Sequence, residues 1–250
     1  MGEPARKLPS LEESSDDPFR LGWRLRSVRL PDGRADLVEE PLTAEDLLDP
    51  QLGDHLVQNS WHVATVYRLF DILSRRYKAH PDVFVSCGLK MIWGIPGLQE
   101  PAPDIAVIPR VRDKVRMRRS FHVLKEGTRP ALAIEIVSEE PEQRSADHEG
   151  KVGIYERAQV PEYFILDPPS PSEDRCRLTG YRLNAVGRYE AIVPDAEGRL
   201  LSKSTNLWFA PAHRSVHLVD AATGEQILTG DEEADRLRAE LDRLKNPLRV

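Results

Sequence analysis

The chain has 250 residues, of which 40% are hydrophobic and 30% charged, with a formal net charge of -6 at pH 7. This length allows one main domain with extensions, because domains usually run to roughly 100 to 200 residues. The acidic balance excludes a protein that coats nucleic acid through bulk positive charge, although it leaves local surfaces open. No apolar run is long enough for a membrane span, so we expect a soluble protein without membrane contact.

The cysteines and the first residues favour a reducing compartment. Cys87 and Cys176 lack the paired spacing of a zinc site and the density of a disulfide framework. The start, MGEPARKLPS, has no apolar core of the kind that a signal peptide needs. We therefore expect a cytoplasmic protein.

The N-terminal third predicts a disordered segment, a strand and a helix. Residues 1–22 are polar and proline-punctuated, and we expect them to be disordered. Alternation from Trp23 to Leu30, followed by Pro31-Asp32-Gly33, predicts a strand and a turn. Thr43, with Asp46 three residues later, predicts a short helix in TAEDLL. A 3.6-residue apolar period predicts the first long helix from Asn59 to Lys78, with one face on a sheet.

The middle of the chain predicts the core of that sheet. Asp82 to Trp93 has the β-branched and aromatic residues of a strand. The runs DIAVI and ALAIEIV are long enough for strands buried on both faces. A helical segment separates the second run from YFILD, and strand, helix and strand predict a right-handed crossover.

Beyond Pro168 the chain predicts short strands, which we expect to extend the sheet in antiparallel fashion. The last part has leucines at spacings of 4 and 3 amid charged residues, which predicts an amphipathic tail helix. The expected organisation is a folded domain over residues 23–230 and a helical tail over residues 231–250. The expected strands are Arg177 to Leu183, Gly187 to Val193 and Ser215 to Val219.

Two acidic residues lie inside apolar strands, Asp104 in APDIAVIP and Glu135 in ALAIEIVS. A carboxylate there costs several kcal/mol of desolvation unless a metal ion, a cation or hydrogen bonds compensate it. Two such residues in successive strands indicate one shared partner, most simply a divalent metal ion. Magnesium is held by one or two carboxylates plus water and substrate phosphate oxygens.

Lys151 follows on a helix, with Asp147 four residues earlier on the same face. A lysine beside a metal-bound phosphate can orient or help deprotonate the attacking water and offset charge in the transition state. These roles match phosphodiester hydrolysis. Structural explanations stand beside them, because Asp104 follows Pro103 and suits a turn, and Lys151 alone is an ordinary helix lysine.

A basic segment follows Asp104. If this segment is extended, its even positions align five cations along one side, which suits a row of DNA phosphates. A solvated loop or a charge-protected edge strand is the alternative. The candidate DNA-binding residues are Arg110, Arg112, Lys114, Arg116, Arg118 and Arg119.

The series PDIAVIP, IEIVS, DHEGK and IYERAQVPEYFILDP resembles the Uma-two family, a bacterial branch of the PD-(D/E)xK nuclease superfamily. The likeness covers roughly Asp36 to Leu241. It implies a restriction-endonuclease-like α/β core, in which helices flank a central mixed sheet, with antiparallel C-terminal strands and a tail helix. It also implies a catalytic site of Asp104, Glu135 and Lys151, with His62 on the first core helix able to approach the metal or the phosphate.

Two positions depart from the pattern. The superfamily lysine usually lies two residues after the acid, where this chain has Val137, and the family is read as having moved it to the following helix, which Lys151 fits. Gln159 stands where the family usually has glycine, and glutamine is less comfortable in a left-handed helix cap.

The leading hypothesis is an endonuclease that acts on DNA with Mg2+, for which Mn2+ can substitute, and that forms a homodimer because two strands must be cut. The second is a catalytically inactive nuclease-fold module that binds nucleic acid or a protein partner. The third makes Asp104 and Glu135 the acid and base of a glycosidase. An aromatic content of 6% offers few platforms for stacking sugars and disfavours it.

Overall fold

The centre of the protein is a mixed six-stranded sheet, seen in a computed structural model that describes residues 17–138, 140–170 and 172–245. Its strands are β4 (Phe84–Cys87), β6 (Ile105–Ile108), β8 (Leu132–Ile136), β9 (Glu162–Asp167), β10 (Arg177–Leu183) and β11 (Tyr189–Ala191). Their spatial order is β11-β10-β9-β8-β6-β4. β8 and β9 pair in parallel, whereas the other neighbours in this sheet pair antiparallel. The predicted α/β class with a central mixed sheet is therefore confirmed.

One face of the sheet is covered by α1 (Ser60–Arg76), the predicted first long helix. Asn59 caps its start, since the Asn59 side chain accepts a hydrogen bond from the backbone N–H of His62 at 2.8 Å. Leu69 and Leu73 on its apolar face belong to the same buried cluster as Phe164 of β9. Burying one such leucine stabilises the fold by roughly 1.5–3 kcal/mol.

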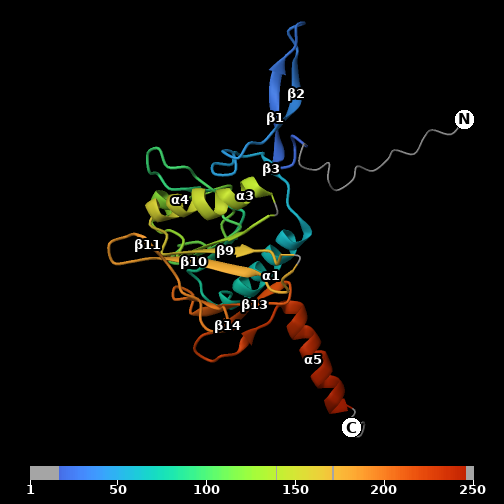
Figure 1. Cartoon of the computed structure of the whole chain (residues 1–250), viewed down its shortest axis with the longest axis vertical. Coiled ribbons are helices and arrows are strands. Elements are labelled where there is room, and N and C mark those ends of the chain that lie inside the picture. The colour runs from blue at the N-terminus through green and yellow to red at the C-terminus, as the bar shows by residue number, and fades with distance from the viewer. Residues whose placement is uncertain (1–16, 139, 171, 246–250) are drawn as a thin grey trace, which may run out of the picture.

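The other face is covered by one helical segment that joins β8 to β9 (Figure 1). It consists of α3 (Pro141–Ser145), the π-helical turn η2 (Ala146–Gly150) and α4 (Lys151–Arg157). A π-helical turn contains one more residue than an α-helical turn and is frequent at functional sites. Since β8 and β9 are parallel, this is the predicted crossover.

The second residue after this segment adopts a conformation that glycine adopts more readily. Gln159 has a φ of 57°, in the left-handed region. Its side-chain amide donates hydrogen bonds to the carbonyl oxygens of Glu156 at 2.8 Å and Gly187 at 3.0 Å. These bonds offset part of the backbone strain that glutamine introduces here.

The C-terminal strands divide between two sheets. β10 and β11 extend the central sheet as predicted, but β12 (Leu200–Ser202), β13 (Leu207–Ala212), β14 (Ser215–Asp220) and β15 (Gln226–Ile227) form a separate antiparallel sheet. The prediction that Ser215 to Val219 joins the central sheet is wrong. This second sheet packs beside α1, because Phe209 and Leu218 share a buried cluster with Leu69 and Leu73 of that helix.

The N-terminal part forms a small sheet of β1 (Gly22–Arg29), β2 (Ala35–Pro41) and β3 (His55–Leu56). The predicted strand and turn are confirmed as the β1–β2 hairpin. Figure 1 shows this hairpin projecting from one end of the protein and α5 (Gly230–Lys245), the predicted tail helix, from the other. We expected residues 1–22 to be disordered. Residues 1–16 lie outside the described residues, and Leu21 is buried beside Leu42 and Leu47.

The helix predicted in TAEDLL is wrong, since residues 44–48 form turns. The Asp46 carboxylate does accept hydrogen bonds from the N–H and the hydroxyl of Thr43, at 2.8 and 2.7 Å. Arg24 binds the same carboxylate, and Pro50 prevents further helical hydrogen bonds.

The strand predicted from Asp82 to Trp93 is interrupted at Gly88, whose φ is 57°. Its second half, β5 (Met91–Ile92), pairs in parallel with β7 (Phe121–His122), which leads into α2 (Val123–Glu126). Within the described residues, no helix combines the length and apolar character needed to cross a membrane.

Candidate active site

Asp104 and Glu135 lie side by side on neighbouring strands. Ile105 pairs with Ile134, so the antiparallel register continued by one residue sets Asp104 opposite Glu135. Asp104 Oδ2 accepts a hydrogen bond from the backbone N–H of Ile136 at 2.8 Å. Glu135 is only 2% exposed, and alternation along β8 directs it toward α4, because Ile134 and Ile136 belong to the cluster on the α1 side.

Lys151 reaches this pair of acids from the start of α4. Its Nζ lies 3.0 Å from Glu135 Oε2 and 2.8 Å from Asp147 Oδ1. The Asp147–Lys151 pair expected from the four-residue spacing is therefore formed. Val137, at the usual lysine position, is fully buried among apolar residues, so the ammonium comes from the helix instead of the strand.

Tyr155 completes the surroundings of Glu135 and was not identified from the sequence. Its hydroxyl donates a hydrogen bond to Glu135 Oε1 at 2.8 Å. Asp147, Lys151 and Tyr155 follow one another at four-residue spacing, so the helical segment directs all three to one side. That spacing is the signal that could have identified Tyr155. Tyr163 adds a hydrogen bond to the Asp147 carbonyl oxygen at 2.9 Å.

Burial and mutual repulsion perturb these groups strongly. Burial, partly offset by Lys151 and reinforced by Asp104, raises the pKa of Glu135 well above its usual range. Burial likewise raises the pKa of Asp147 against the opposing effect of Lys151. Burial alone would lower the pKa of Lys151, but Asp147, Glu135 and Asp104 outweigh it and raise that pKa. The lysine therefore carries its proton at neutral pH.

His62 of α1 lies against the same site. Its Nε2 is 3.2 Å from Asp104 Oδ1, but the contact is not aligned for a hydrogen bond. Burial lowers the pKa of His62, and Asp104 more than offsets this effect and raises it. Within the described part of the chain, neither ring nitrogen of this buried side chain has a hydrogen-bond partner. His62, the predicted accessory residue, thus lies beside Asp104.

Asp104, Glu135 and Lys151 line one pocket, whose outer wall belongs to the N-terminal part of the chain. The apolar residues of that wall include Leu47, Leu56 and Val57. Segment 42–58 therefore narrows the approach to the acids.

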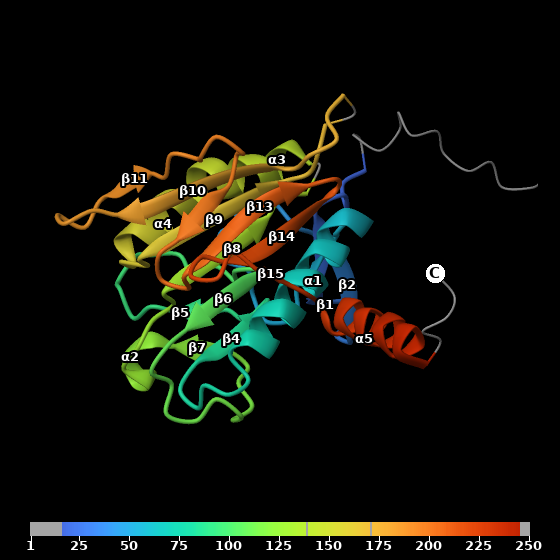
Figure 2. The same ribbon diagram turned by 90° about the horizontal axis from the view of Figure 1, so that it is seen from below.

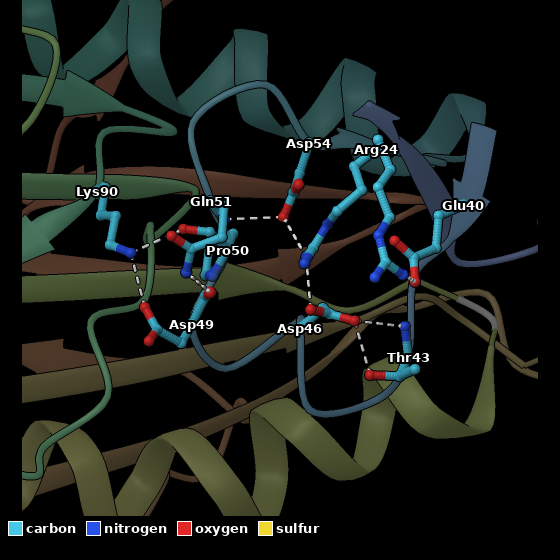
Figure 3. A network of polar contacts seen from close by, with 10 residues as sticks. Arg24, Glu40, Thr43, Asp46, Asp49, Pro50, Gln51, Asp54 and Lys90 are labelled. Atoms are coloured by element: carbon cyan, nitrogen blue, oxygen red, sulfur yellow. Dashed lines mark hydrogen bonds and ion pairs between the residues drawn. The ribbon is translucent and has the colours of Figure 1, made fainter. Parts of the chain in front are cut away.

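Ion pairs fix this wall to the rest of the protein (Figure 3). Arg24 of β1 binds both Asp46 and Asp54. Lys90, in the loop before β5, binds Asp49 at 2.7 Å and the carbonyl oxygen of Pro50 at 2.9 Å. The wall is thus tied to the hairpin on one side and to the core on the other.

The donor set suits a hard divalent cation. Across residues 17–138, 140–170 and 172–245, no three His, Cys, Asp or Glu side chains form a ready metal cage. Asp104 and Glu135 nevertheless offer adjacent carboxylate oxygens, and magnesium usually keeps several waters on one or two carboxylates. Three acidic side chains surround the Lys151 ammonium, and a divalent cation beside Asp104 and Glu135 would favour the ionised forms of these acids.

The predicted DNA-binding segment is a loop. Residues 109–120 contain no strand, so the expected row of aligned cations is not formed. Lys114 donates hydrogen bonds to the carbonyl oxygens of Tyr77, Lys78 and His80, at the end of α1. Arg118 is almost fully buried and binds Glu126 through two nitrogens. The exposed cations of the set are Arg110, Arg112, Arg116 and Arg119.

This loop lies far from the paired acids. It follows the end of β6 opposite to Asp104, about 13 Å of strand away. Figure 2 shows α2 and β7, the elements that follow the loop, on the opposite side of the protein from α3. The loop is therefore no part of the pocket.

Comparison with known proteins identifies the family of this chain. Residues 53–212, more than half of the chain, match the Uma2 family, described as "Putative restriction endonuclease". The chain belongs to this family, which confirms the resemblance of its motifs. The comparison with curated proteins finds no match.

Among solved structures, the chain is similar to a protein of Anabaena variabilis described as a putative nuclease belonging to DUF820. The sequence identity is 17%, and the TM-score is 0.41. The alignment covers 74% of this chain and 86% of the other.

Proposed function

We propose that this protein is a divalent-metal-dependent endonuclease that hydrolyses DNA phosphodiester bonds, with Mg2+ as its cofactor and Mn2+ able to substitute. The observation that supports this most strongly is the meeting of Asp104, Glu135 and Lys151 in one pocket, from two strands and a helix. Membership of a family of restriction-endonuclease-like proteins agrees with it.

Asp104 and Glu135 are the proposed metal ligands. A bound divalent ion would polarise the phosphate and lower the pKa of a water molecule, which is the chemistry that carboxylates alone do not supply. The backbone N–H of Ile136 fixes Asp104, and the Tyr155 hydroxyl fixes Glu135, so both carboxylates are held in place before substrate arrives.

Lys151 acts through its charge in this proposal. Because its pKa is raised, it holds its proton and can donate hydrogen bonds to the attacking water or to a phosphate oxygen. Negative charge that builds up on the phosphate is thereby offset. Asp147 keeps the ammonium in position at 2.8 Å, and His62 can contact the phosphate beside Asp104.

The exposed cations of the loop after β6 remain proposed outer contacts to DNA, because B-form DNA is long enough to extend beyond the pocket. Lys114 and Arg118 serve the fold instead, through their contacts with α1 and Glu126. A cytoplasmic location is part of the proposal and agrees with the free thiols of Cys87 and Cys176.

We also propose a homodimer that pairs through α5. Leu237, Leu241 and Leu244 are 47%, 52% and 72% exposed, and they form one stripe along the helix. The helix is mounted firmly, because Glu232 in its first turn binds Arg68 of α1 through two oxygens at 2.8 and 3.2 Å. A rigidly held helix with an uncovered leucine stripe suits a second copy of itself.

Charges along α5 favour a parallel pair. With the leucines at the a and d positions of a heptad, Glu233 and Glu240 occupy g positions, and Arg238 and Lys245 occupy the e positions five residues later. Parallel helices bring each such glutamate near the cation of the other copy, whereas antiparallel helices bring like charges together.

A cleavage assay tests the proposed activity. With Mg2+ or Mn2+, the purified protein should nick supercoiled plasmid DNA, and Glu135→Ala should abolish nicking. Asp36→Ala, an exposed acid of the hairpin, is the control and should cleave normally. Thermal unfolding of each variant shows whether the fold is intact.

Unchanged nicking by a folded Glu135→Ala variant would contradict the proposal. Absent cleavage and absent metal binding, with DNA still bound, would instead support the inactive binding module.

A further inference from the structure

A second polar pocket lies on the outer side of the helical segment that carries Asp147 and Lys151. Its lining includes Arg144, His148, Asp167, Arg177 and Thr179. Asp147 turns inward to Lys151, while the next residue, His148, turns outward to Asp167. α3 and η2 therefore separate this outer pocket from the candidate active site.

The buried acid Asp167 holds Arg144 and His148 of the outer pocket in place. Its side chain is 2% exposed and ends β9. Arg144 Nη1 lies 2.9 Å from its Oδ1, and His148 Nε2 lies 3.0 Å from its Oδ2. The Asp167 carboxylate contacts one nitrogen of Arg144 and one of His148. The other N–H donors of Arg144 and the second ring nitrogen of His148 therefore remain available on the solvent side.

Arg177 adds an uncommitted cation at the same place. It lies directly across from Asp167 in the pairing of β9 with β10, and its side chain is exposed. Within the described part of the chain, its guanidinium forms no ion pair or side-chain hydrogen bond. The solvent face of the outer pocket thus presents two arginines, a histidine and the Thr179 hydroxyl, against the single exposed acid Glu149.

The strand register places the outer pocket next to the paired acids. Glu135 on β8 pairs with Ile165 on β9, and Asp167 lies two residues further along. With strands 4.8 Å apart and a rise of 3.3 Å per residue, the two backbones are separated by about 8 Å at these residues. A nucleic-acid strand crossing the ends of β8 and β9 would set neighbouring phosphates over both sites.

We propose that the outer pocket is a phosphate subsite, in which Arg144, Arg177 and His148 bind a backbone phosphodiester of the substrate strand beside the scissile one. This rests on the proposed nuclease function. The arginines supply the planar, bidentate donors that suit phosphate oxygens, and Asp167 keeps Arg144 oriented before substrate binds. Here, and not in the distant loop after β6, cations stand beside the candidate active site.

The test measures binding of a labelled DNA duplex to the full chain carrying Glu135→Gln, so that the strands stay intact. Arg177→Ala in this parent removes one phosphate contact without touching the Asp167 ion pairs. We expect the Kd for DNA to rise about tenfold. The slope of log K against the logarithm of the salt concentration should become shallower by about one. Arg236→Ala, an exposed arginine on α5, is the matched control and should change neither quantity.

Arg177→Glu extends the test, because a reversed charge should weaken binding further. Binding is measured at a temperature at which thermal unfolding shows the variant to be folded, because the new carboxylate lies across from Asp167. Unchanged affinity and salt slope in both Arg177 variants would overturn the subsite and leave the nuclease proposal standing. A parent protein that binds no DNA at low salt, together with a wild type that does not cleave, would overturn both.

Discussion

The contact between Tyr155 and Glu135 allows a sharp test of how the site is held. Tyr155→Phe removes the hydroxyl that donates to Glu135 Oε1 at 2.8 Å and leaves the ring in place. The ring keeps its packing against Trp93 and Tyr163. The substitution therefore deletes one hydrogen bond to a buried carboxylate and little else.

The expected effect follows from that carboxylate. Leaving a buried acceptor without its donor costs about 1–3 kcal/mol, so the free energy of unfolding should fall by about 2 kcal/mol. The lost bond also opposed the rise in the pKa of Glu135, so the carboxylate becomes harder to ionise. Removing groups that orient metal ligands typically weakens metal binding 10- to 100-fold. We expect the Kd for Mn2+ to rise by at least about tenfold.

Calorimetric titration with Mn2+ and urea unfolding in chelator measure these two effects separately. Tyr189→Phe is the control, because its hydroxyl donates to the carbonyl oxygen of Val160 at 2.8 Å, away from Glu135. The control should lose stability without losing metal affinity. Equal Mn2+ affinity in wild type and Tyr155→Phe would refute the role given to Tyr155.

Other variants test the fold and the assembly. Lys114→Ala removes the cation that binds three carbonyl oxygens just after α1 and should lower the free energy of unfolding by about 1–2 kcal/mol in urea. Arg112→Ala, on the same loop, should change this free energy by less than about 0.5 kcal/mol. Burial opposes ionisation of Glu162, but hydrogen bonds from Ser202, Ser204 and Arg182 lower its pKa below the usual 4.5. The ionised Glu162 therefore stabilises the fold above pH 4.5, and this stabilisation is lost as the pH falls through the folded-state pKa. Glu162→Gln should therefore be about 3 kcal/mol less stable than wild type at pH 7 and closer to it at pH 3, and a constant difference across this range would contradict the assignment. Leu241→Asp on α5 should convert a dimer to a monomer in light scattering, and a wild type that is already monomeric at micromolar concentration would contradict the pairing of α5.

Much of the core could be predicted because its signals are local. The apolar period of α1 and the apolar runs of β6, β8 and β9 reflect burial, which the residue types indicate directly. The pairing of Asp104 with Glu135 followed from the same logic, since each acid interrupts a buried strand and needs a partner. The position of Lys151 was available only through its motif, because a helix lysine has no distinctive local pattern.

The parts that were missed depend on contacts between distant segments. Asp46 forms the local contact of a helix cap, yet Arg24 competes for its carboxylate and the chain turns instead. Lys114 and Arg118 have the composition of a DNA-binding row, but one caps α1 and the other stacks on Phe84 and Phe121. A charged side chain gives no sign in the sequence of whether its partner is a phosphate or the end of a helix.

The separate second sheet was missed for a related reason. The sequence of a short strand does not indicate which sheet the strand joins, because its backbone can form the same hydrogen bonds in either sheet. Glu162 of β9 binds Ser202 and Ser204 through its carboxylate, which links the second sheet to the central one. That choice depends on a buried polar contact some 40 residues apart in the chain.

In the proposed mechanism, Asp104 and Glu135 form a metal site within reach of Lys151. Anomalous diffraction from crystals soaked in Mn2+ tests it most directly. One strong manganese peak is expected between the carboxylates of Asp104 and Glu135, with oxygen distances close to the roughly 2.0–2.1 Å of a magnesium site. A fully soaked crystal with no peak there, or with manganese bound only elsewhere, would contradict it.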